Sequence, residues 1–234
     1  EYSYKIAAID NEGNESGFTN TVNVTPINLN PPATPQNLSI KAHNLPTEFQ
    51  VNVELTWDHN TEADFSHYKL FRSDVSDLFA ANAASFLDSI TDNFYVDEDV
   101  TPGTTYHYKL IAYDQGGTLE APAAGPVSDI PLEVPTLVSP IDGNSIDTTT
   151  PTFHWVNVDG AVKYKIIVRT SSVTGDIWES TMDATTDAEM TITYPSNATV
   201  PLGATTLYYW FVSGYSKDTE DINVFTPVTG FRTP

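Results

Sequence analysis

Residues 102–114 read Pro102-Gly-Thr-Thr-Tyr-His-Tyr-Lys-Leu-Ile-Ala-Tyr-Asp114, and this stretch decides the fold because related stretches occur three times along the chain. It reads as a turn leading into one strand, with alternate side chains on opposite faces. An earlier copy begins at Glu1 and a more divergent copy at Leu207. The copies lie roughly 100 residues apart, which is the size of a β-sandwich domain, so the sequence predicts a tandem array of such domains.

The repeated strand resembles one domain family. The pattern Val100-x-Pro-Gly-Thr-x-Tyr-x-Tyr-x-Leu-x-Ala-x-Asp114 is similar to the end of strand E and all of strand F in fibronectin type III domains. The resemblance implies that Tyr106 is the tyrosine-corner residue, whose hydroxyl bonds to backbone just upstream. Leu55-Thr-Trp57 and residues 62–73 look like the strand B tryptophan and the strand C of bacterial members. The third copy, at residues 201–208, departs from the motif and leaves its corner unassigned.

We therefore predict an all-β chain of tandem fibronectin type III-like β-sandwiches, with one partial module followed by two complete ones. Residues 1–29 supply strands F and G only, residues 30–132 form a fibronectin type III domain, and residues 133–234 form a diverged fibronectin type III-like or Ig-like domain. Proline-rich stretches at 26–35 and 131–135 read as the connections between modules.

The amino-acid composition limits the partners and the cellular location that can be expected for this protein. The formal net charge is −21, and such a field repels phosphates, which argues against nucleic-acid and anionic-membrane partners. Solubility explains this acidity more simply than a specific cationic partner does. The absence of cysteine excludes disulfides, thiol nucleophiles and cysteine-bound zinc, and favours a prokaryotic secreted or surface protein. No apolar run approaches the roughly 18 residues of a membrane span, so membrane insertion is not expected.

The sequence carries no catalytic constellation. Nothing links its histidines to a serine or carboxylate as a triad would, and it lacks phosphate-binding glycine loops, so we predict no enzyme, no catalytic residues and no cofactor. His67 and His107, on neighbouring strands C and F, could form a two-histidine metal site, but chance pairing on polar strand faces is preferred. The acidic residues of 10–16 invite a calcium interpretation, and those of 97–99 invite a metal-site interpretation. An ordinary turn and a solvated acidic corner, respectively, are preferred to them.

An interaction surface is predicted on the outward face of strands C and F. Large apolar side chains are unusual on water-facing strands, so grouped ones suggest a protein contact. Coverage by neighbouring loops or by lysine and arginine stems is the alternative. The residues are Phe71, Ile111 and Tyr113 in the second module and Ile167, Tyr209, Phe211 and Tyr215 in the third.

A second surface is predicted on the first hairpin, where Tyr2, Tyr4 and Ile6 share one face. A two-stranded hairpin is marginal alone in water, so we expect other protein to complete it. The missing strands could come from an upstream segment or from another copy by donor-strand exchange. Folding back onto the second module is the third possibility.

These features predict a non-catalytic structural or adhesive module of a secreted or cell-surface protein, for example a subunit of an extracellular filament or appendage. Its partners would be other protein modules or copies of itself. The alternative is the accessory spacer or binding region of a secreted polysaccharide- or peptide-degrading enzyme, although only Trp178 suggests glycan binding. The flanking reading frame would separate the two, since it would encode either more repeats or a catalytic domain.

Overall fold

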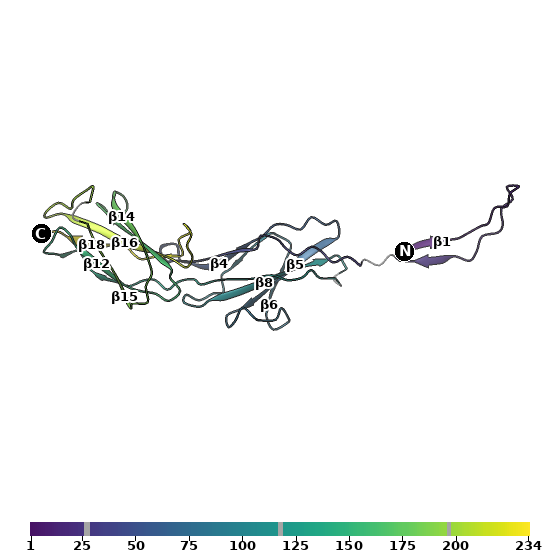
Figure 1. Cartoon of the computed structure of the whole chain (residues 1–234), viewed down its shortest axis with the longest axis horizontal. Coiled ribbons are helices and arrows are strands. Elements are labelled where there is room, and N and C mark those ends of the chain that lie inside the picture. The colour runs from purple at the N-terminus through teal and green to yellow at the C-terminus, as the bar shows by residue number, and fades with distance from the viewer. Residues whose placement is uncertain (26–28, 117–118, 196–197) are drawn as a thin grey trace. The chain divides into compact units, whose positions relative to one another are not determined.

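The computed structural model describes residues 1–25, 29–116, 119–195 and 198–234. These residues form two compact units, Glu1–Pro31 and Pro32–Pro234, shown in Figure 1. The predicted first connection, residues 26–35, is described only in part, because residues 26–28 lie outside the described ranges. The regular structure is β throughout, apart from the short 3-10 helix η1 (Pro46–Glu48).

The first unit is an antiparallel hairpin of β1 (Tyr2–Tyr4) and β2 (Val22–Val24), and both strands are shorter than the ranges 2–9 and 19–25 that the sequence pattern predicts. Its turn is closed by the Asp10 carboxylate, which accepts the backbone N–H groups of Glu12 and Asn14, each at 2.9 Å. The Asn14 side chain also donates to this carboxylate and is the main cause of its lowered pKa. These contacts are those of an Asx-type turn, which agrees with the ordinary turn that the sequence favours for residues 10–16.

The second module is a sandwich of two sheets. The order β3-β4-β7 makes one sheet, and β6-β5-β8-β9 makes the other. Trp57, Tyr68, Tyr108 and Leu110 are buried between them, which confirms the predicted inward face. The strands are β3 (Ser39–Leu45), β4 (Gln50–Thr56), β5 (Phe65–Ser73), β6 (Phe86–Ile90), β7 (Phe94–Asp97), β8 (Tyr106–Asp114) and β9 (Ala124–Asp129).

The third module repeats this plan with a more aromatic core. One sheet has the order β10-β12-β15, and the other is built around β13, β14, β16 and β18. Phe153, Trp155, Tyr164 and Trp210 are fully buried. The strands are β10 (Leu137–Ser139), β11 (Asn144–Ser145), β12 (Thr152–Val156), β13 (Lys163–Arg169), β14 (Asp176–Asp183), β15 (Glu189–Thr193), β16 (Leu207–Tyr215), β17 (Val224–Phe225) and β18 (Thr229–Arg232).

Both complete modules contain a tyrosine corner. The Tyr106 hydroxyl accepts the N–H of Thr101 at 2.9 Å, which confirms the role implied by the resemblance. The Tyr208 hydroxyl accepts the N–H of Gly203 at 2.8 Å. The same interaction at the same spacing therefore persists in the third module, where the sequence motif does not show it.

The acidic corner at residues 97–99 is not fully solvated, which corrects the preferred interpretation. Asp97 is 2 % exposed. Its Oδ2 accepts the Tyr108 hydroxyl and an Arg72 N–H, each at 2.8 Å. Since Arg72 lies on β5 and Asp97 on β7, this ion pair joins the two sheets of the second module. A buried carboxylate requires such partners because desolvation of its charge is costly.

Candidate intermodule interface

The two complete modules are joined through their backbones. At their meeting point β3 and β17 run parallel, with Asn44 opposite Val224. The Asn44 N–H donates to the Asn223 carbonyl at 2.7 Å. One sheet therefore continues from the third module into the second, in the order β11-β18-β16-β17-β3-β4-β7.

Two buried asparagines hold the connecting segment. Asn44 Nδ2 donates to the Leu132 carbonyl at 2.7 Å. Asn223 accepts the Leu132 N–H at 2.7 Å and donates to the Ile130 carbonyl at 2.8 Å. Both asparagines are almost inaccessible to water, so removing either side chain leaves buried backbone groups unsatisfied. Each group left in this way costs about 1 to 3 kcal/mol.

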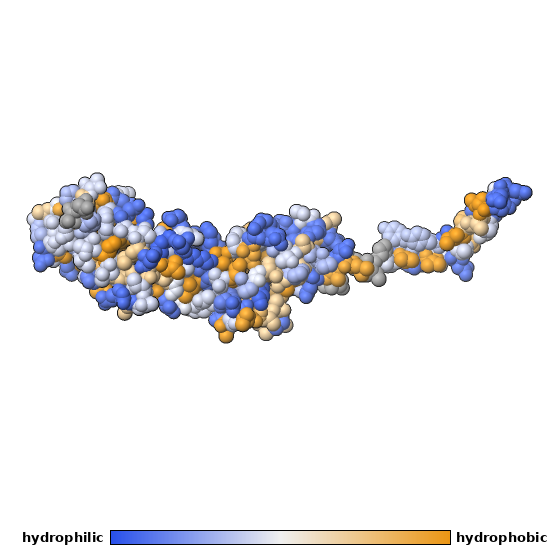
Figure 2. Space-filling view, in the orientation of Figure 1, coloured by the Kyte–Doolittle hydropathy of each residue, from blue (hydrophilic) through white to orange (hydrophobic). Residues whose placement is uncertain are grey.

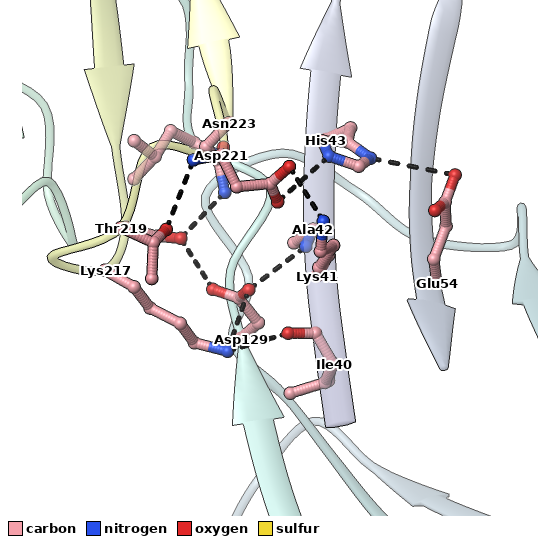
Figure 3. Close-up of polar contacts among 12 residues, drawn as sticks. Ile40, Lys41, Ala42, His43, Glu54, Asp129, Lys217, Thr219, Asp221 and Asn223 are labelled. Atoms are coloured by element: carbon pink, nitrogen blue, oxygen red, sulfur yellow. Dashed lines mark hydrogen bonds and ion pairs between the residues drawn. The ribbon is translucent and has the colours of Figure 1, made fainter. Parts of the chain in front are cut away.

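The Asp129 carboxylate, at the end of β9, joins three segments (Figure 3). Its Oδ2 accepts the Ala42 N–H at 3.0 Å and pairs with Lys217 Nζ at 3.1 Å. Its Oδ1 accepts the Ser216 hydroxyl at 2.7 Å. The Asp129 side chain is 4 % exposed, and its only ion-pair partner among the described residues belongs to the third module. Separating the modules would leave this buried charge without its counter-ion.

A second set of charges lies closer to solvent. Lys41 pairs with Asp221 at 3.1 Å, and His43 lies between Asp221 at 3.4 Å and Glu54 at 3.8 Å. Partly exposed pairs of this kind contribute roughly 0 to 1 kcal/mol each. Lys41 and Asp221 border, together with Asp129, a cavity of about 340 Å³ between the modules.

Apolar packing completes the interface. Leu132 is fully buried, so the second predicted connection, 131–135, is a packed joint rather than a free spacer. A Cβ at Gly160 would lie 3.0 Å from the Ile130 side chain, and the φ of +82° at Gly160 also favours glycine. A Cβ at Gly214 would lie 2.9 Å from Val224. The absence of a side chain at Gly160 therefore lets the connecting segment approach closely, whereas at Gly214 it makes room for β17 of the same module.

The predicted interaction residues of the second module are present on one face, but they are covered. Phe71, Ile111 and Tyr113 are each less than 9 % exposed. Phe79, in the loop that precedes β6, packs against them, and Lys69 Nζ lies 4.1 Å from the centre of the Tyr113 ring. A neighbouring loop and a lysine side chain therefore cover these residues, which is the alternative to an exposed interaction surface.

Cations also cover the corresponding face of the third module. Arg169 lies over the Phe211 ring and Lys163 over the Tyr215 ring, and Tyr215 is 3 % exposed. Ile167 and Tyr209 are half-buried. The first hairpin differs, because Tyr2, Tyr4 and Ile6 are 59, 57 and 71 % exposed.

The described residues hold no metal-binding cluster of three or more side chains. His67 and His107 face Tyr113 and Ser73 in the pairing of β5 with β8, so they lie near opposite ends of this strand pair and cannot share a metal ion. No three His, Cys, Asp or Glu side chains in these ranges are placed to hold a metal. Trp178 packs against the core ring of Phe153. No helix in the described ranges is long and apolar enough to cross a membrane.

The interface residues Asn44, Asp129 and Asn223 were not singled out from the sequence. Each is a common turn or strand-end residue, and its role depends on a partner about 90 residues away. The one sequence feature that could have indicated this interface is Leu132, an apolar residue between the two prolines of the connection 131–135.

Comparisons with known proteins give a distant fold likeness. No family model and no curated protein matches this chain. Among solved structures, the chicken CNTN1 FN1-FN3 domains match 99 % of this chain and 77 % of theirs, with 14 % identity and a TM-score of 0.39. The chicken interferon gamma receptor alpha chain matches 86 % of this chain and 98 % of its own, with 11 % identity and a TM-score of 0.36. The strand order and the two tyrosine corners therefore remain the basis for describing the sandwiches as fibronectin type III-like.

Proposed function

We propose that this chain is a non-catalytic structural or adhesive module of a secreted or cell-surface protein, in which residues 32–234 act as a stiff two-domain spacer. The observation that carries the proposal is the intermodule interface, where Asn44, Asp129 and Asn223 fix the connecting segment. Interfaces within a chain commonly permit domain motion, but buried polar bonds and a shared sheet oppose it. The accessory spacer of a secreted hydrolase would use the same stiffness, and only the flanking reading frame separates these settings.

The proposed stiffness is tested by measuring whether the two sandwiches orient together. Residual dipolar couplings on the full chain should give one alignment tensor for both modules. Asn223→Ala should give two tensors because it removes three side-chain hydrogen bonds at the joint. Asn157→Ala is the matched control, since its amide bonds lie within the third module. Independent tensors in the unmodified chain would overturn the proposal, and so would hydrolysis of a glycan or peptide that one substitution abolishes.

We infer that protein beyond residues 1–31 completes the first hairpin. The support is the exposure of Tyr2, Tyr4 and Ile6, since burying each side chain would be worth roughly 1.5 to 3 kcal/mol. The missing strands could come from the same polypeptide or from another copy of it, and either source would cover these side chains.

Tyrosine nitration tests this inference. The tyrosines at positions 2 and 4 should react readily in the 234-residue chain and be protected in the assembled parent protein, whereas the buried Tyr68 should be protected in both. Reaction at positions 2 and 4 in the assembled protein would contradict it.

A further inference from the structure

The second module carries an apolar pocket beside an open sheet edge. Phe71, Phe86 and Tyr113 contribute to its lining together with residues 81–83, and its volume is about 410 Å³. This volume is at the lower end of the range for ligand pockets. Phe86 is 46 % exposed, although it lies on a strand of the sandwich. The pocket is therefore open to a partner side chain of aliphatic or aromatic type.

The loop before β6 also carries exposed apolar side chains. Val75 and Leu78 are each 87 % exposed. Figure 2 shows hydrophobic residues gathered on the part of the molecule that carries β6 and this loop. Exposed apolar groups gathered on one part of a surface mark a protein contact more often than scattered ones do.

The charges beside the pocket select the partner. Residues 32–234 contain six lysines, of which Lys41, Lys163, Lys165 and Lys217 form ion pairs. The other two are Lys69 and Lys109, and neither pairs with a carboxylate of the described residues. Lys69 lies over Tyr113, and Lys109 lies over Phe79 and donates to its carbonyl. In a chain of net charge −21, these two lysines carry positive charges that no described carboxylate pairs, so they can attract negative groups of a partner.

The neighbouring edge provides backbone groups for a strand. β6 pairs with β5 and, among the described strands, with no other. An open edge can accept an extended peptide, whose backbone supplies affinity while alternate side chains enter pockets. A sugar fits less well, because Lys69 and His67 both lie against the Tyr113 ring and this ring is 8 % exposed.

We propose that this pocket and the β6 edge bind an extended acidic segment of a partner protein. One large aliphatic or aromatic side chain of the segment occupies the pocket, and Asp or Glu residues on either side face Lys69 and Lys109. This binding activity goes beyond the proposed spacer role, which stands or falls independently on the stiffness of the interface.

Nuclear magnetic resonance of the ¹⁵N-labelled full chain tests the proposal. The probe is an acetylated peptide, Asp-Glu-Asp-Phe-Asp-Glu-Asp-amide, and the control peptide has Lys at every acidic position. We expect shift changes confined to β6, the loop before it and Lys69 with the acidic peptide only. Lys69→Glu combined with Lys109→Glu should weaken binding by about tenfold or more, and Phe86→Ala by at least several-fold.

Two matched variants serve as controls. Phe94→Ala removes a phenyl group that is 56 % exposed on the other sheet, and Lys165→Gln removes an ion-paired lysine of the third module. Neither should change the affinity. Absence of shifts at millimolar peptide, shifts centred on β7 or β9, or equal binding of the lysine peptide would overturn the proposal. Concentration-dependent shifts of β6 without peptide would identify a second copy as the occupant and would also overturn it.

Discussion

The second and third modules bury different residues at the same position of their repeated strand. Tyr108 in β8 and Trp210 in β16 both follow the corner tyrosine by two residues, and both are fully buried. The Tyr108 hydroxyl donates to the Asp97 carboxylate at 2.8 Å, whereas Trp210 Nε1 donates to the Pro140 carbonyl at 2.7 Å. One site thus tolerates either residue when the polar atom of its ring finds a partner.

The difference extends to the charge content of the two cores. In the second module Tyr108 donates to the buried Asp97 carboxylate, which also pairs with the partly buried Arg72. In the third, Trp210 packs against Phe153, and Val168 occupies the strand position that corresponds to Arg72. A repeated fold can therefore join its sheets either by a buried ion pair or by aromatic packing alone. The first solution depends on every partner being present, because each charge is costly when left alone.

The largest expected effect is the loss of one charge from the second core. Arg72→Met should destabilise this module by about 3 to 5 kcal/mol, because it leaves the Asp97 carboxylate buried without its cation. Hydrogen exchange resolved by residue would measure the loss separately for each module.

Converting the second core to the chemistry of the third is the control for this loss. The triple variant Arg72→Met, Asp97→Leu and Tyr108→Phe should recover more than half of the stability lost in Arg72→Met. A loss in Arg72→Met below about 1 kcal/mol would show that the ion pair contributes no more than an exposed one.

A smaller effect is expected from removing the polar atom of each ring. Trp210→Phe should cost about 2 to 3 kcal/mol, since it creates a cavity and leaves the Pro140 carbonyl unsatisfied. Tyr108→Phe should cost about 1 kcal/mol, because Arg72 still binds the Asp97 carboxylate. Urea unfolding followed by the same exchange measurement would compare them. Equal losses would contradict the assignment of different partners to the two rings.

The repeated strand was predictable from sequence because its information is local. Alternation of Tyr108 and Leu110 with polar residues sets the inward face, and the register of a strand with period two follows from it. The tyrosine corner of Tyr106 was predictable for the same reason, since its partner lies five residues upstream. The corner of Tyr208 was left open because the preceding turn changed while the geometry did not.

The remaining features depend on distant partners. Asp97 looked like part of a solvated acidic run because the sequence does not show that Arg72, 25 residues away, reaches it. Phe71 and Tyr113 looked exposed because the loop and the lysine that cover them follow no periodic pattern. The intermodule interface was invisible for the same reason, since Asn223 is bonded to a segment more than 90 residues earlier.

The smallest expected effect concerns Tyr113 and its counterpart Tyr215, which end the outward face of β8 and β16. Burial, as the larger cause, and the hydrogen bond to Glu120 together raise the pKa of Tyr113 to about 12. Burial also raises the pKa of Tyr215, but the neighbouring Lys165 opposes this shift. Glu120→Gln should therefore lower the pKa of Tyr113 while leaving it above the ordinary value of about 10.

The sign of the resulting pH dependence follows from proton linkage. A phenol whose pKa is raised by folding binds its proton more tightly in the folded state, so its contribution to stability is complete below about pH 10. That contribution declines as the pH rises toward 12, with a slope of at most about 1.4 kcal/mol per pH unit for one group. Tyr113→Phe should reduce this decline, and Glu120→Gln should reduce it less, because burial remains the larger cause. Unfolding free energies measured between pH 9 and about 12, with ¹³Cζ shifts to follow each phenol, would test the order. A larger reduction from Glu120→Gln than from Tyr113→Phe would contradict it, because the carboxylate would then act through a group other than this phenol.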